Sequence, residues 1–186
     1  MKKLAFTISI LVSLVSFSQM TSEQLYNKLV YKPLYDDSVF LSQHKIDEQK
    51  LKISILKEIN AQRKLNHIQP LTLHTAAENK KTAIWCDTVV KRKMLSHDHE
   101  YMKNTNTNRV QSEIVAGYYI TPIKFEQSTD IYTVIAKLAV DSWMGSPQHR
   151  VLMLSPSISI AAIGSAFGIP SSTQYGIIGS STARFY

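Results

Sequence analysis

Residues 143–150 have the sequence Trp-Met-Gly-Ser-Pro-Gln-His-Arg, which predicts the junction between two helices. Proline is favoured at the first position of a helix, and a serine just before it can cap the helix start through its hydroxyl oxygen. We therefore expect a short helix over residues 148–154, with Ser146 as its cap rather than as a nucleophile. His149 would lie about three residues into this helix, where the positive end of the helix dipole favours a neutral imidazole.

Apolar residues at helical spacing predict two amphipathic helices earlier in the chain. Leu51, Ile55 and Ile59 are four residues apart and indicate a helix that ends near Leu65. A second helix is expected over residues 75–94. Its apolar stripe consists of Ala76, Ala83, Cys86, Val90 and Met94.

The third helix has the most regular apolar stripe of the chain. We expect it to begin after a cap at Ser128 or Thr129 and to extend to Trp143, which we interpret as a core residue; the alternative is that Trp143 lines a cleft. The stripe is formed by Ile131, Val134, Ile135, Leu138, Ala139 and Ser142.

Three segments have the composition of β-strands. Residues 113–120 are rich in β-branched and aromatic side chains. Two further apolar runs, 158–167 and 175–185, are separated by Gly168, Pro170 and two serines, which predicts an antiparallel hairpin. The chain therefore combines helices with a strand-rich centre.

The first eighteen residues have the layout of a cleavable signal peptide. Lys2 and Lys3 precede an apolar run that is too short to cross a bilayer, and small residues follow it. We expect cleavage between Ser18 and Gln19 and a secreted or periplasmic protein without a transmembrane segment. The expected organisation is a signal peptide over 1–18, an N-terminal extension over 19–50 and one domain over 51–186.

Charge and cysteine content restrict the partners. The formal net charge of +7 becomes +5 when Lys2 and Lys3 are removed with the leader, since each carries one positive charge. The basic residues are scattered and lack interleaved aromatic residues, which argues against nucleic-acid binding. Cys86 is the only cysteine, so an intramolecular disulfide is impossible. We interpret Cys86 as a small buried residue; the alternatives are a reactive thiol or a dimer bridge.

The ordered set of motifs resembles the bacterial branch of the CAP superfamily, which comprises cysteine-rich secretory, antigen 5 and pathogenesis-related 1 proteins. The resemblance covers about residues 51–186. It rests on the segments Ile55–Asn60 with Arg63, Pro70-Leu71-Thr72, Ser96-His97, 143–150 and Ile163-Gly164. It implies an α+β fold, a three-layer α-β-α sandwich with a mainly antiparallel central sheet.

The resemblance also implies a cleft. Its residues would be His97, Glu113 and His149, with Ser146 where eukaryotic relatives have a second glutamate. The chain departs from the family again where Ser112 and Ile114 flank Glu113, since glycine and asparagine are usual there.

Two interpretations of this cleft remain open. In the first interpretation, the two imidazoles are a candidate zinc pair, since histidine is a common ligand of that metal. In the second, the cluster is purely structural, and Glu113 orients a histidine. The first functional hypothesis is a non-enzymatic binding module for a small molecule, lipid, metal or extracellular partner protein, which requires no cofactor. The alternative is a zinc-assisted hydrolase, with His97 and His149 as ligands and Glu113 as general base.

Overall fold

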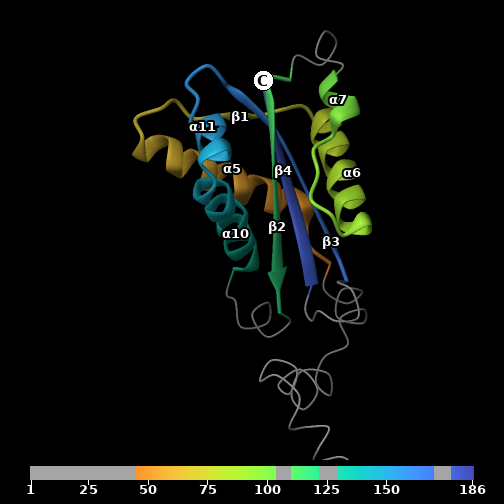
Figure 1. Cartoon of the computed structure of the whole chain (residues 1–186). Helices are drawn as coiled ribbons and strands as arrows, with labels where there is room; N and C mark the ends of the chain where they lie inside the picture. Colours follow the sequence, from red (N-terminus) through yellow and green to blue (C-terminus); the bar gives the residue numbers. More distant parts are fainter. Residues whose placement is uncertain (1–44, 104–109, 122–129, 170–176) are drawn as a thin grey trace, which may run out of the picture.

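The computed structural model describes residues 45–103, 110–121, 130–169 and 177–186, which form three layers with a sheet in the middle (Figure 1). The elements in chain order are α5 (Glu48–Leu65), β1 (Thr72–Leu73), α6 (Ala76–Arg92), α7 (His99–Lys103), β2 (Ser112–Ile120), α10 (Ile131–Gly145), α11 (Pro147–Met153), β3 (Ile160–Gly168) and β4 (Ile177–Phe185).

The strands form one sheet in the order β1-β3-β4-β2. β4 pairs antiparallel with both β2 and β3, and the two-residue β1 runs parallel to the start of β3. Helices α5, α10 and α11 lie on one side of the sheet and α6 on the other (Figure 1). The expected α-β-α sandwich with a mainly antiparallel sheet is therefore confirmed, and so is the C-terminal hairpin.

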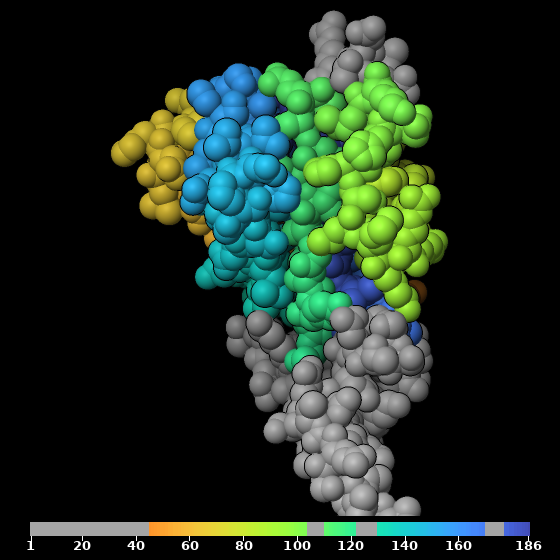
Figure 2. Space-filling view, in the orientation of Figure 1, coloured from red at the N-terminus to blue at the C-terminus, as the bar shows by residue number. Residues whose placement is uncertain are grey.

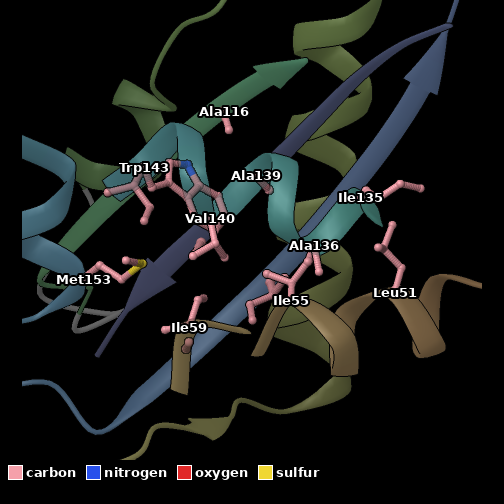
Figure 3. Packing of buried hydrophobic residues seen from close by; sticks show 14 of the residues in the cluster. Leu51, Ile55, Ile59, Ala116, Ile135, Ala136, Ala139, Val140, Trp143 and Met153 are labelled. Atoms are coloured by element: carbon pink, nitrogen blue, oxygen red, sulfur yellow. The ribbon is translucent and has the colours of Figure 1, made fainter. Parts of the chain in front are cut away.

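The apolar core lies between the sheet and the α5–α10 layer. Leu51 and Ile55 of α5 belong to the same buried cluster as Ile135 and Ala139 of α10 (Figure 3). Trp143 is fully buried at the end of this layer, as expected for a core residue, and it does not line a cleft. The strands contribute every second residue, for example Ile114, Ala116, Tyr118 and Ile120 of β2.

The layer between the sheet and α6 depends on small residues. Gly164 faces α6 so closely that a Cβ atom there would lie 2.3 Å from the backbone nitrogen of Ala83. The opposing helix face is partly polar, with Asn79, Thr82 and Cys86 buried. Close contact of backbones therefore replaces large apolar side chains in this layer.

The second predicted helix differs from the observed α6 at both ends. Ala76 is exposed, and Met94, which is 59% exposed, lies beyond the helix. Lys93 ends α6 because its backbone is left-handed, with a φ of 53°. The predicted stripe is therefore wrong at Ala76 and Met94, whereas Cys86 and Val90 are buried as expected.

Two further boundaries differ from the sequence predictions, and two short elements are additional to them. Asp130 caps α10, so the predicted cap is wrong; Ser128 and Thr129 lie outside the described residues. Helix α5 begins at Glu48, three residues before the predicted start. The short elements β1 and α7 were not predicted. Residues 1–18, the proposed leader, also lie outside the described residues.

The junction at residue 146 agrees with the sequence prediction. Pro147 is the first residue of α11, and the Ser146 hydroxyl accepts the backbone N–H of His149 at 3.5 Å. This hydroxyl therefore serves as the helix cap.

Candidate functional site

The structure brings together His97, Glu113 and His149, which are far apart in the chain. His97 lies between α6 and α7, Glu113 is in β2 and His149 is in α11. His97 Nδ1 is 3.1 Å from Glu113 Oε1, and the His97 and His149 ring centroids are 6.4 Å apart. The His97 side chain is 45% exposed, whereas that of Glu113 is only 1% exposed. The two imidazoles are therefore accessible from a site whose carboxylate is buried beneath them.

Both carboxylate oxygens of Glu113 are already engaged. Oε1 accepts the backbone N–H of Asp98 at 2.9 Å in addition to its contact with His97. Oε2 accepts Nε–H of Arg184 at 2.7 Å. Glu113 therefore orients its neighbours, as in the structural interpretation of this cluster.

Arg184 is the site residue that sequence reasoning missed. Its side chain is fully buried, and besides Glu113 it donates to Asp98 Oδ2 at 2.7 Å. The Tyr101 ring stacks on its guanidinium group, 3.9 Å from the ring centroid to Cζ. The signal was a single arginine inside an otherwise uncharged strand, because a buried cation requires a carboxylate partner.

A second polar cluster supports this arrangement from α6. The Tyr101 hydroxyl donates to Glu78 Oε2, and the Tyr186 hydroxyl donates to the same oxygen at 3.3 Å. Lys81 forms an ion pair with Glu78 at 2.7 Å. Burial alone would raise the pKa of Glu78, but the hydrogen bonds from Lys81 and Tyr101 outweigh it and lower that pKa. This cluster connects α6, α7 and the C-terminal residue, and it holds Tyr101 over Arg184.

His149 is favoured in its neutral form. Partial burial lowers the pKa of its imidazole, and the nearby His97 lowers that pKa further. His99 is exposed, with its ring centroid 6.4 Å from that of His97. Ser96, His97 and Asp98 do not form a triad, since Asp98 pairs with Arg184.

Comparison with protein families identifies the domain. The family model described as CAP, the cysteine-rich secretory protein family, matches residues 56–174. The chain belongs to the CAP family. No significant match was found among the curated proteins.

Solved CAP-like structures share limited identity with this CAP domain. An outer surface protein from Borrelia burgdorferi is 15% identical, with a TM-score of 0.47 over 76% of this chain and 96% of that one. A cysteine-rich secretory protein from Staphylococcus aureus is 16% identical, with a TM-score of 0.43 over 75% of this chain. An extracellular SCP-domain protein from Bacillus anthracis is 14% identical, with a TM-score of 0.41 over 74% of this chain. The chain spans 39% of the S. aureus protein and 41% of the B. anthracis protein.

The cluster of His97, Glu113 and His149 offers two imidazole nitrogens for a metal. Within the described residues, no group of three or more His, Cys, Asp or Glu side chains is arranged to hold an ion. A catalytic zinc needs about three protein ligands. His97 and His149 therefore fall short of such a site by one ligand, because Glu113 is committed to Arg184. Zinc binding by the histidine pair stays a prediction.

The CAP domain has an apolar hollow at the opposite end of β2 from Glu113, which we call the α6–β2 hollow. Its volume is about 310 Å³. Figure 2 shows it as a gap between the end of α6 (yellow-green) and β2 (green), with blue atoms at its floor. It is lined by Val89, Val90, Lys93, Met94, Leu95, Gly117, Tyr118, Tyr119, Ile178, Gly179 and Ser180. Leu95 can lie against β2 because Gly117 has no Cβ, which would be 2.9 Å from a Leu95 methyl carbon.

Proposed function

We propose that this CAP protein is an exported, non-enzymatic binding module. Export is supported by the basic and apolar leader over residues 1–18. It is also supported by the descriptions of similar structures as secretory, outer surface and extracellular proteins. No helix among the described residues is both long and apolar enough to span a bilayer.

The α6–β2 hollow carries the proposed binding role. Ligand pockets are typically about 300–1,000 Å³ and mostly apolar, with a few polar groups that orient the ligand. The hollow is at the lower end of that range, and Met94 and Leu95 at its wall are 59% and 58% exposed. Apolar side chains of this size are stabilised when a ligand removes them from water.

The charge at the rim defines the class of ligand. Lys93 lines the hollow, and Lys91 and Arg92 directly precede it on the exposed end of α6. Asp87 neutralises Lys91 through an ion pair at 2.6 Å, so Lys93 is the cation in the lining that can face an anion. An amphiphile with an apolar chain and an acidic head group, such as a fatty acid, matches both features.

The hydrolase hypothesis lacks comparable support. A general base must accept a proton from the attacking water, but the Glu113 oxygens already accept from Arg184, Asp98 and His97. The geometry therefore favours a structural role for the Glu113 cluster and a binding role for the hollow.

Titration with 11-(dansylamino)undecanoic acid, a fluorescent fatty acid, tests this proposal. We expect saturable binding with a blue-shifted emission, because the dansyl group leaves water. Lys93→Glu and Leu95→Gln should each raise the Kd by about tenfold, equivalent to about 1.4 kcal/mol.

Matched controls are available at the end of α5. Lys64 and Leu65 are exposed like Lys93 and Leu95, and they do not line the hollow. Lys64→Glu and Leu65→Gln should leave the Kd within about twofold, below about 0.4 kcal/mol. Equal effects in both pairs, or no saturable binding, would reject the proposed function.

A further inference from the structure

Strand β3 lacks a neighbouring strand along most of one edge in the described part of the chain. β1 pairs with it through two residues only, Thr72 with Ile160 and Leu73 with Ala161. The chain then turns away into α6, whereas β3 continues to Gly168. An edge strand of this kind presents backbone donors and acceptors that can pair with another extended chain.

The hydrogen bonds at the start of β3 show which groups face the open edge. Ile160 accepts the N–H of Tyr186 at 3.0 Å and therefore faces β4, whereas Ala161 accepts the N–H of His74 at 2.9 Å on the opposite side. Peptide groups alternate along a strand, so those of Ile163 and Ser165 face the same side as Ala161. The N–H of Ile163 donates there to the Asn79 side chain at 2.8 Å.

The peptide groups of Ser165 and Phe167 are the next ones along β3 that face the open edge, and Asn79 does not bind them. Within the described residues, no hydrogen bond to their edge-facing peptide groups is found. Both residues are partly exposed and lie at the floor of a groove of about 540 Å³. The floor therefore offers two N–H donors and two carbonyl acceptors to an incoming backbone.

The walls of this groove indicate the side chains that it accepts. The start of α5 forms one wall and α6 the other, with Ile84 contributing an apolar side chain that is 58% exposed. Lys45, Lys52 and Lys80 line the groove together with two carboxylates, Glu48 and Asp87. Asp87 is paired with Lys91, so Glu48 alone opposes the three lysines.

We propose that the open edge of β3 is a docking site for an extended peptide with acidic side chains, supplied by another protein. The peptide adds a strand beside Ile163–Gly168, in the position that β1 occupies beside Ile160 and Ala161. About six residues cover this length, at about 3.3 Å per residue. Backbone hydrogen bonds to Ser165 and Phe167 supply the affinity, and the lysines select acidic residues.

Amide hydrogen exchange followed by NMR on the full chain tests the proposal directly. The probe is an acetylated hexapeptide of alternating valine and glutamate. Without it, the amides of Ser165 and Phe167 exchange rapidly, whereas those of Gly164 and Ala166, which face β4, are protected. At saturating peptide, we expect protection of Ser165 and Phe167 to increase by at least about tenfold.

The control peptide has the same sequence with alternate residues N-methylated, which removes backbone donors on one side. Two such peptides are compared, one methylated on its odd-numbered residues and the other on its even-numbered residues. Only one side of the peptide pairs with β3, so we expect one of the two peptides to bind and the other not to bind. In the protein, Lys52→Glu with Lys80→Glu should weaken binding by about tenfold, whereas Lys57→Glu, on the exposed face of α5 outside the groove, should not.

Other occupants of the edge give different exchange patterns. Protection of Ser165 and Phe167 without peptide at every protein concentration would mean that the chain itself covers the edge. Protection that grows with protein concentration would mean a second copy. Either pattern, or no added protection with the acidic peptide, would overturn the proposal.

Discussion

At the scale of single residues, the buried pair of Glu113 and Arg184 determines how the histidine site is held. Both side chains are almost completely excluded from water and meet at 2.7 Å. Removing one partner from such a pair leaves an uncompensated charge and costs about 3–5 kcal/mol. Arg184→Met should therefore lower the free energy of unfolding by that amount, measured by urea denaturation.

His97→Ala is the comparison for that prediction. Its imidazole also contacts Glu113, but it is 45% exposed, so its loss should cost less than about 1 kcal/mol. If Arg184→Met and His97→Ala are equally mild, the buried ion pair is not what fixes the site.

The sequence predicted the histidines and the glutamate of this site but not the arginine. His97, Glu113 and His149 could be selected because the family resemblance gave their positions. Arg184 depends on the register between β2 and β4, which places it opposite Glu113. Strand register is set by packing across the whole sheet and cannot be deduced from one strand alone.

At the scale of secondary-structure elements, the contact between α6 and β3 depends on Gly164. A Cβ atom there would lie 2.3 Å from the nitrogen of Ala83 and 2.5 Å from the carbonyl carbon of Thr82. Backbone atoms cannot rotate away, so Gly164→Ala must displace the helix. We expect a loss of about 1–3 kcal/mol in the free energy of unfolding, measured in urea.

Gly145→Ala provides the matched control. Gly145 is the last residue of α10, and apart from its chain neighbours and the backbone of its own helix no heavy atom lies within 4 Å of the Cβ that alanine would add. Alanine is preferred to glycine in helices, so this variant should be neutral or more stable by up to about 1 kcal/mol. Destabilisation of equal size in both variants would contradict the role assigned to Gly164.

The long elements could be predicted from the sequence because each has its own periodicity. The limits of α10 and α11 agree with the sequence prediction to within about two residues. β1 could not be predicted, because two residues are too few to show an alternation of apolar and polar side chains. Its pairing partner is also distant in the chain. The end of α6 was missed because the apolar spacing continues to Met94, although Lys93 adopts a left-handed backbone.

At the scale of the whole molecule, a chain with a single cysteine must hold its fold without an intramolecular disulfide. The described core contains apolar side chains from both helical layers and from all the longer strands. Cys86 of α6 is fully buried next to Thr182 of β4, and desolvation raises the pKa of its thiol to about 12. A thiol of this kind is mostly neutral at physiological pH and inaccessible to a partner, which disfavours both a reactive cysteine and a dimer bridge.

The midpoint of thermal unfolding should therefore be the same with and without dithiothreitol. A disulfide that closes a long loop would contribute about 2–4 kcal/mol, which this chain cannot obtain from one cysteine. Iodoacetamide should modify Cys86 only after urea unfolds the protein, because the reactive thiolate is scarce and shielded in the folded state. Mass spectrometry of the native protein after alkylation measures this directly. Modification of the folded protein, or a dimer that dithiothreitol separates, would show that Cys86 is accessible from outside. The α6 layer would then open more readily than its close packing on β3 implies.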